Sequence, residues 1–442
     1  ADAITLDPNG GAVLAGVTTV STVKVGSGVT ISSDGDVFTT GITTSSTVIV
    51  GSGVTISESG IEASGIGITC ANINGTQIGG RKNLIINGAM QVAQRGTSYT
   101  GANSYNSLDR VSVQHSGLNE DVTSSQSAVA SGTSPYAEGF RNAFKITNGN
   151  QSAGAGSSDY LYWWTILEAQ DIANSGWNYT SPSSFITISF WIKSSVAQNF
   201  YGFLQTADGT SQSLAYETGS LTADTWTKIV KTIPGNSNLQ FDNDANAGLY
   251  WAPARAFDGT DRTASMSLDT WATYSGSSRT PDATSTWYTT NDATLEITGL
   301  QMEVGPQATA FEHRSMGEEL LLCQRYYFKL GKLDYISQHM SANEVYGIGM
   351  SDNDGTNIYA MINFPVRMRD APTAIDQSGS AADYRVRRDT TKACSGVPTF
   401  VEASEHYCRV NFPSSSHGWG TGQMLWCMSA GSSGYLGFES EL

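Results

Sequence analysis

The sequence is short of charge, of cysteine and of long apolar runs. Charged residues make up 14% of its 442 residues, against roughly 25% in a typical soluble domain. The 24 basic residues are outnumbered by 40 acidic ones, which gives a net charge of −16. Since no run of Lys or Arg stands out, the sequence disfavours both a nucleic-acid partner and an anionic membrane surface.

The five cysteines are few, odd in number and widely spaced, so a disulfide framework is not expected. Buried thiols in a protein made in a reducing cytoplasm are the expected state, and one bridge among Cys394, Cys408 and Cys427 is the alternative. No apolar run approaches about 18 residues, so no membrane insertion is expected. The sequence opens with no charged segment followed by an apolar one, so no signal peptide is expected either.

What the sequence does have is glycine, serine and threonine. The 47 glycines are about 11% of the chain, against roughly 7% on average. Threonine fits pleated strands, whereas glycine and serine fit turns, so a polar surface built from hydroxyls favours β-structure. We therefore expect an all-β protein.

An internal repeat lies near the N-terminus. Residues 16–32 and 41–57 are identical at 14 of 17 positions, at an offset of 25 residues. Each copy alternates apolar and polar residues on both sides of a Gly-Ser-Gly turn, which predicts short strands with one apolar face. Two repeats cannot bury that face alone, so the pattern predicts a parallel homotrimeric β-shaft; a disordered linker is the alternative. The predicted axis residues are Val23, Val25, Val29, Ile31, Val48, Val50, Val54 and Ile56.

Aromatic residues appear on strand-like runs after residue 83. DYLYWWTIL (159–167) and FITISFWIKS (185–194) are the clearest. Many short strands without helical patterns between them predict a sandwich or jelly roll. One helix is expected from Met316 to Leu330, because Ser315 and Glu318 form a capping box and Gly331 is a stop signal.

These patterns divide the chain into four predicted parts. Residues 1–82 form a shaft and attachment region, and residues 83–314 form a jelly roll. Residues 315–331 form a helical junction, and residues 332–442 form a small C-terminal β-sandwich at the tip.

Two segments resemble bacteriophage tail-fibre and minor tail proteins. They are NLIINGAMQVAQRGTS (83–98) and LEITGLQMEVGPQATAFEHRSMGEELLLCQRYY (295–327). The VGSGVTIS repeats are similar to fibre shafts such as those of marine phages, and FPVRMRDAPTAI (364–375) and GYLGFESEL (434–442) are also typical of such proteins. The resemblance implies a jelly roll similar to carbohydrate-binding modules, a homotrimer and a place in the phage virion, with assembly in the host cytoplasm. It also implies attachment to tail or baseplate proteins through the N-terminal region.

Signals for catalysis are poor. The sequence has no G-x-S-x-G elbow, no H-E-x-x-H and no C-x-x-C pair. We therefore expect no enzyme, no catalytic residue, no cofactor and no metal site. Three Asp-rich turns, at 241–248, 257–263 and 351–357, read as solvated turns, with a structural calcium as the alternative interpretation.

The candidate ligand-binding residues are aromatic, because rings in polar pockets stack on the flat faces of sugars. Trp191 falls on the polar face of its strand, opposite a face of Ile186, Ile188, Phe190 and Ile192. In DYLYWWTIL, Tyr162 and Trp164 share one face with Tyr160. Trp419 lies in the Gly-rich loop HGWGTG. For each ring, packing in an interface or a second core layer is the competing interpretation.

These observations favour a tail fibre that adsorbs to a host surface polysaccharide without catalysis. We expect the C-terminal domain with Trp419 to carry host specificity, and the jelly roll to add a weaker contact or none. A structural adaptor without glycan binding is the alternative. A capsule-degrading spike is disfavoured, because its β-helical body would need many more repeats than two.

Overall fold

A computed structural model describes residues 82–101, 104–259, 267–277, 279–331, 344–352, 355–415, 418–431 and 433–442. Before them it describes only the backbone of short strands. The chain divides into two compact units, Ala1–Ala71 and Asn72–Leu442. Among the described residues, strands and antiparallel sheets predominate and the few helices are short, as the composition predicts.

Seven short strands are described in the first unit. The second repeat forms a hairpin, in which Val48 pairs with Ile56 and Val50 with Val54 around the predicted turn. Val23 and Val25 lie outside the described residues, and the side chains of the other six axis residues are not described. The shaft and its axis therefore stay predictions. The strands are β1 (Ile4–Leu6), β2 (Ala12–Leu14), β3 (Val29–Ile31), β4 (Val37–Thr39), β5 (Val48–Val50), β6 (Val54–Ser57) and β7 (Gly60–Ala63).

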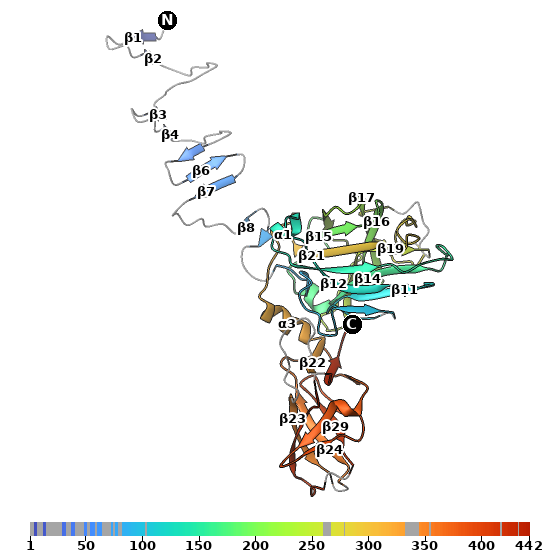
Figure 1. The fold of residues 1–442 in the computed structure, drawn as a ribbon. Coiled ribbons are helices and arrows are strands. Elements are labelled where there is room, and N and C mark those ends of the chain that lie inside the picture. The colour runs from blue at the N-terminus through green and yellow to red at the C-terminus, as the bar shows by residue number, and fades with distance from the viewer. Residues whose placement is uncertain are drawn as a thin grey trace. The chain divides into compact units, whose positions relative to one another are not determined.

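A β-sandwich follows, drawn from cyan to yellow in Figure 1. One sheet, the β15 sheet, has the strand order β10-β12-β13-β21-β15-β18, and the other, the β14 sheet, has the order β11-β14-β19-β16-β17-β20. A separate pair of strands, β8 (Asn72–Ile73) and β9 (Thr76–Gln77), precedes the sandwich. The first strands of the sandwich are β10 (Ser98–Thr100), β11 (Ser112–Ser116), β12 (Thr123–Ala128), β13 (Asn142–Thr147) and β14 (Tyr160–Glu168). Later strands are β15 (Phe185–Ser194), β16 (Asn199–Thr206), β17 (Gln212–Ser220), β18 (Thr227–Pro234), β19 (Ala247–Asp258), β20 (Ala272–Thr273) and β21 (Thr294–Val304). Two short helices, α1 (Ser134–Ala137) and α2 (Ala169–Ala173), lie in the connections.

Alternation along each strand builds the sandwich core. The four apolar residues of β15 that the sequence assigns to one face all belong to the main hydrophobic cluster. On β14, Leu161 and Trp163 enter this cluster, whereas Tyr160, Tyr162 and Trp164 belong to a separate aromatic group. Side chains of successive strand residues point to opposite faces, so the second set lies on the outer face of the β14 sheet.

The described residues between 327 and 442 form a second β region with its own hydrophobic cluster. It consists of a three-stranded sheet, β22-β31-β25, and a seven-stranded sheet, β27-β26-β30-β23-β24-β29-β28, which we call the β23 sheet. Its strands are β22 (Tyr327–Gly331), β23 (Val345–Ser351), β24 (Asn357–Asn363), β25 (Ile375–Gln377), β26 (Tyr384–Arg387), β27 (Thr391–Ala393), β28 (Thr399–Ala403), β29 (Tyr407–Pro413), β30 (Met424–Ser429) and β31 (Tyr435–Glu439); a 3-10 turn covers Ala381–Asp383. Four cysteines of the described residues, Cys323, Cys394, Cys408 and Cys427, are buried free thiols.

The predicted helix exists but is shorter than expected. Helix α3 runs from Met316 to Gln324, and its capping box at Ser315 and Glu318 is present. The prediction that it continues to Leu330 is wrong, because Tyr327–Gly331 forms β22 and pairs with β31. Leu321 on this helix is 48% exposed, so its side chain is not part of a core.

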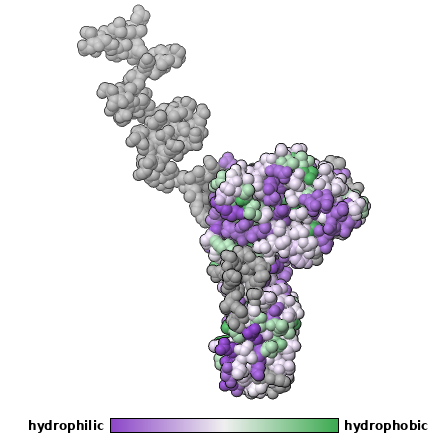
Figure 2. Space-filling view, viewed as in Figure 1, coloured by the Kyte–Doolittle hydropathy of each residue, from purple (hydrophilic) through white to green (hydrophobic). Residues whose placement is uncertain are grey.

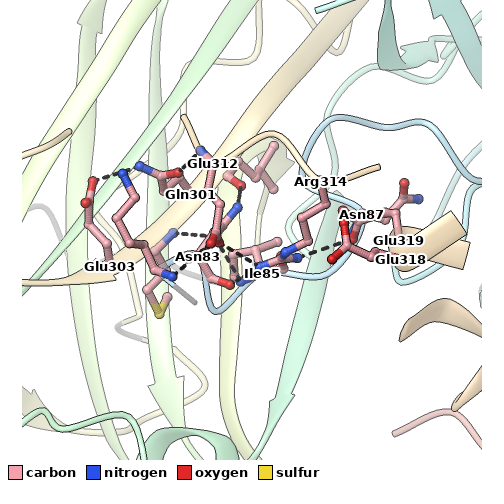
Figure 3. A network of polar contacts seen from close by, with 12 residues as sticks. Asn83, Ile85, Asn87, Gln301, Glu303, Glu312, Arg314, Glu318 and Glu319 are labelled. Carbon is pink, nitrogen blue, oxygen red and sulfur yellow. Dashed lines mark hydrogen bonds and ion pairs between the residues drawn. The ribbon is translucent and has the colours of Figure 1, made fainter. Parts of the chain in front are cut away.

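Hydrogen bonds join the two segments that carry the tail-fibre resemblance (Figure 3). The side chain of Asn83 donates to the carbonyl of Leu300 at 2.9 Å and accepts from the backbone N–H of Met302 at 3.1 Å. The N–H of Asn87 donates to Glu319, and Arg314 donates to the carbonyl of Ile85 at 3.0 Å. The segment after Lys82 is therefore fixed along β21 and the start of α3 without forming a strand of its own.

The turn within the first segment depends on its two residue types. Asn87 has a φ of 60°, a left-handed conformation that Asn tolerates better than most residues. A Cβ added to Gly88 would lie 2.2 Å from the carbonyl oxygen of Leu300. Glycine is therefore the only residue that allows this approach to β21.

The second half of the same segment reaches the C-terminal β region. The Gln94 side chain donates to the carbonyl of Tyr327 at 2.6 Å, and the Arg95 guanidinium lies 3.7 Å from the centroid of the Tyr327 ring. Glu441 forms ion pairs with both Arg95, at 3.2 Å, and Arg110. The final residues of the sequence thus return to the sandwich (Figure 1).

Asp109 makes this contact region sensitive to pH. Burial raises the pKa of Asp109 to about 6, although Arg95 and two hydrogen bonds from Gln94 oppose the shift. An unfolded Asp has a pKa of about 4, so the folded chain retains a proton between pH of about 4 and 6 that the unfolded chain has lost. This group therefore lowers the free energy of unfolding as the pH rises through that window, and its effect is constant above it.

We expect the Asp109→Asn variant to lack this dependence. Urea unfolding of the wild type and the variant at pH 4 and pH 7 measures it. The stability of the variant relative to the wild type should rise by on the order of 2–3 kcal/mol between the two pH values. A difference that is the same at both pH values would show that Asp109 is ionised throughout.

Candidate functional site

The outer face of the β14 sheet carries a hollow of about 420 Å³. Strand pairing brings its residues together. Ser112 and Gln114 on β11 lie opposite Trp164 and Tyr162 on β14, and Gln205 on β16 lies opposite Tyr250 on β19. The residues lining the hollow include Tyr105, Ser112, Gln114, Trp164, Ile166, Gln205, Tyr250, Tyr274, Arg279 and Leu442.

The rings in and beside the hollow are in mutual contact. The Trp164 and Tyr250 ring centroids are 4.9 Å apart, and those of Trp164 and Tyr162 are 5.4 Å apart. Trp164 and Tyr250 are each half-buried, whereas Tyr162 is buried against Phe203. The packed rings fix the orientation of the two that remain partly exposed.

Buried charges lie beside the Tyr162 ring, since Arg255 is its direct partner on the neighbouring strand. Asp258 pairs with Arg255 and, at 3.4 Å, with Arg279. Both guanidiniums lie within 5.7 Å of the centroid of the Tyr162 ring. Burial raises the pKa of the Tyr162 hydroxyl, and Arg279 opposes this shift. At neutral pH the hydroxyl of Tyr162 is therefore protonated.

The hollow offers polar groups beside the rings. The Gln114 amide donates to the Ser112 hydroxyl at 2.9 Å, and the half-buried Gln205 amide lies across the sheet from it. Amides and hydroxyls both donate and accept hydrogen bonds. A half-buried ring face surrounded by such groups suits a ligand with one flat apolar face and a margin of hydroxyl groups, as a sugar ring has.

The predicted site residues are placed in three different parts of the fold. Tyr162 and Trp164 lie together on the β14 sheet, beside and in the hollow. Trp191 lies on the outer face of the β15 sheet, and Trp419 lies in the C-terminal β region. The structure therefore brings only the first two together.

The Trp191 ring packs against the segment from Val129 to Phe140. It is 8% exposed and lies in a small cluster with Val129 and Phe140. Its ring N–H donates to Glu138 at 3.0 Å, and the Lys228 ammonium lies 5.7 Å from the ring centroid. Ligand binding at Trp191 stays an untested prediction, and its surroundings favour the competing interpretation of a second core layer.

Trp419 is half-buried against the C-terminal hydrophobic cluster. Its ring N–H donates to Asp389 at 3.0 Å, and this hydrogen bond lowers the pKa of the Asp389 carboxyl. Part of the ring is therefore used for packing within the chain. Its role as a receptor contact stays a prediction.

Sequence reasoning missed most of the hollow. Gln114, Gln205 and Tyr250 lie on strands far apart in the sequence. They line one hollow only because β11 pairs with β14, β14 with β19, and β19 with β16. Period-two alternation in SVQHS and NFYGFLQT could have placed the two glutamines on outer faces. It could not have shown that these faces meet.

No metal site or membrane helix emerges from the described part of the chain. It contains no group of three or more His, Cys, Asp or Glu side chains that could hold a metal ion. No helix within it is long and apolar enough to cross a membrane. In one of the Asp-rich turns, the Asp352 carboxylate accepts a hydrogen bond from the backbone N–H of Gly355 at 3.0 Å.

Comparison with known proteins finds similarity in structure alone. No family model and no curated protein matches the chain. The enzymatically active domain of tailspike protein 4 from bacteriophage CBA120 matches with 9% identity and a TM-score of 0.25, over 50% of this chain and 21% of that domain. The family 11 carbohydrate-binding module of Clostridium thermocellum, solved with a β-1,3-1,4-mixed-linked tetrasaccharide, matches with 12% identity and a TM-score of 0.22, over 49% of this chain and 98% of the module.

The chain is thus distantly similar in structure to carbohydrate-binding modules and to a phage tailspike domain. It spans only about a fifth of the length of the tailspike domain.

Proposed function

We propose that the chain is a phage tail-fibre protein whose β-sandwich binds a host surface glycan in the hollow on the β14 sheet. The observation that carries this proposal is the half-buried Trp164–Tyr250 pair, set between amide and hydroxyl side chains. The tail-fibre assignment rests on the two sequence segments at 83–98 and 295–327. Attachment through the N-terminal region, trimeric assembly and a place in the virion belong to the same proposal.

The hollow acts by binding alone in this proposal. A glycosidase places two carboxylates across the scissile bond, roughly 5–10 Å apart. Among the described residues that line the hollow, none is Asp or Glu. Stacking and hydrogen bonding to a neutral sugar ring are the chemistry that these side chains support.

In this proposal the first candidate for glycan recognition is the hollow at Trp164, and no longer the loop that carries Trp419. Weak binding at each sandwich becomes strong adsorption when several copies act together, because the first contact raises the effective concentration of the others. A hollow that binds only weakly in isolation is therefore sufficient.

A glycan array probed with the full chain, followed by titration of the best ligand, tests the proposal. Trp164→Ala should weaken binding about tenfold, which corresponds to a loss of about 1.4 kcal/mol of binding free energy. Trp226→Ala is the matched control, because Trp226 is another half-buried tryptophan, packed on the opposite sheet. Equal affinities for wild type and Trp164→Ala, or no glycan ligand at all, would refute the proposal.

A further inference from the structure

Among the described residues that line the hollow on the β14 sheet, one side chain is charged. It is Arg279, and the other lining side chains are neutral. Charged residues are scarce in the sequence, at 14%. On the face in view, Figure 2 shows purple and pale residues over most of the sandwich and smaller green areas. A cation beside stacking rings is therefore a distinctive feature of this hollow.

The Arg279 guanidinium lies at the Tyr162 end of the aromatic row. It is 5.7 Å from the centroid of the Tyr162 ring, 5.5 Å from that of Phe203 and 5.9 Å from that of Tyr274. It also donates to the Tyr162 hydroxyl at 3.5 Å, and the residue is only 9% exposed. A side chain held in this way loses little further freedom when a ligand binds to it.

The balance of charge at this end favours an anion. The Asp258 carboxylate carries one negative charge and is shared by Arg255 and Arg279, so it balances only part of their positive charge. A guanidinium has five N–H donors in a planar fork, so Arg279 can keep Asp258 and still bind a ligand oxyanion. Hydrogen bonds from a guanidinium to an oxyanion are among the strong ones.

The other end of the row is less favourable to an anion. Tyr250 lies there, with its ring centroid 4.9 Å from that of Trp164. Burial raises the pKa of the Tyr250 hydroxyl, and the nearby Asp208 carboxylate raises it further. The two ends of the row therefore differ in charge, and an oxyanion is favoured beside Tyr162.

We infer that the glycan bound in the hollow carries an oxyanion, a carboxylate or a phosphate, which Arg279 binds. This inference rests on the proposed function and specifies its ligand. The sugar ring stacked on Trp164 and Tyr250 is uncharged. The oxyanion belongs to the next residue of the glycan, which lies toward Tyr162.

The charge of the whole chain limits how acidic this glycan is. The net charge of −16 repels a densely charged polymer. A glycan whose anionic groups are separated by neutral sugar residues satisfies both the repulsion from the chain and the local attraction of Arg279.

Matched disaccharides test the inference on the full chain. The probes are glucose, galactose and mannose disaccharides, each in a neutral form, a form with a terminal uronic acid and a form with a terminal phosphate. In calorimetric titrations, one anionic form of the best-bound disaccharide should bind about tenfold more tightly than its neutral form, because hydrogen bonds to charged groups are the stronger ones. The form that gains affinity identifies the oxyanion.

Substitution of Arg279 tests its part in this preference. Arg279→Gln should bind the anionic and neutral forms about equally, and Arg279→Lys, which keeps the charge but loses the planar fork, should show a smaller preference than the wild type. Arg141→Gln is the matched control and should keep the full preference. Arg141 also lies against a tyrosine ring, 3.8 Å from the centroid of Tyr136, but does not line the hollow.

The ratio of the affinities separates the inference from a structural role of Arg279, because a damaged fold weakens binding of all forms alike. Equal binding of the anionic and neutral forms by the wild type would overturn the inference, whether or not Arg279→Gln folds. An unchanged preference in both Arg279 variants would also overturn it. In either case, weaker binding of the neutral form by Trp164→Ala would leave the proposed function standing. If Trp164→Ala bound every form as the wild type does, the proposed function itself would fail.

Discussion

The Glu441→Ala variant should lose about 3–5 kcal/mol of unfolding free energy. The Glu441 carboxylate pairs with Arg95 and Arg110, and the three side chains are only 3%, 8% and 2% exposed. Removing the shared anion leaves two guanidiniums buried without it, which costs far more than the loss of a surface pair. Denaturant unfolding of the full chain measures the change.

Glu439 provides the matched control. It also faces Arg95, at 3.6 Å, but its side chain is 52% exposed. Surface ion pairs contribute up to about 1 kcal/mol, so Glu439→Ala should change the stability little. If the two variants were equally stable, Glu441 would not be the link between the C-terminal residues and the sandwich.

The Asn83→Ala variant should lose about 2–4 kcal/mol. The Asn83 side chain is 1% exposed and bonds the Leu300 carbonyl and the N–H groups of Ile85 and Met302. Each buried partner left without a hydrogen bond costs about 1–3 kcal/mol, and relaxation reduces the sum. Thermal and denaturant unfolding measure the change.

Asn174→Ala is the corresponding control. Its side chain also donates to a backbone carbonyl, that of Gln170 at 2.8 Å, but the residue is exposed. Water replaces that bond, so this substitution should cost little. A similar small cost for Asn83→Ala would mean that the first segment is not held through its asparagine.

Local patterns predicted much of the fold. Alternation in FITISFWIKS separates Phe190, in the main core, from Trp191, in a separate cluster. The capping box at Ser315 correctly marks the start of α3. Each of these signals involves residues close together in the sequence, where propensity and periodicity act directly.

The parts of the fold that the sequence did not predict depend on pairing between strands far apart in the chain. Tyr327 and its neighbours follow a helical pattern without a break, so the sequence extends the helix to Leu330. The structure ends it at Gln324, because pairing with β31 and packing against Arg95 hold this segment as a strand. The residues of the candidate site also differ in whether local sequence patterns predict them. Trp164 was predicted from its own strand, whereas Tyr250 and Gln205 become neighbours only through pairing across the sheet.

The most direct test of glycan binding in the hollow is a crystal structure of the full chain with the oligosaccharide selected by the array. The account predicts one sugar ring stacked against Trp164 and Tyr250, with hydroxyl groups bonded to Gln114 or Gln205. A hollow filled by side chains from a neighbouring copy would contradict it and would favour a purely structural role for these rings. An oligosaccharide bound instead at Trp419 would also contradict it and would place recognition in the C-terminal region.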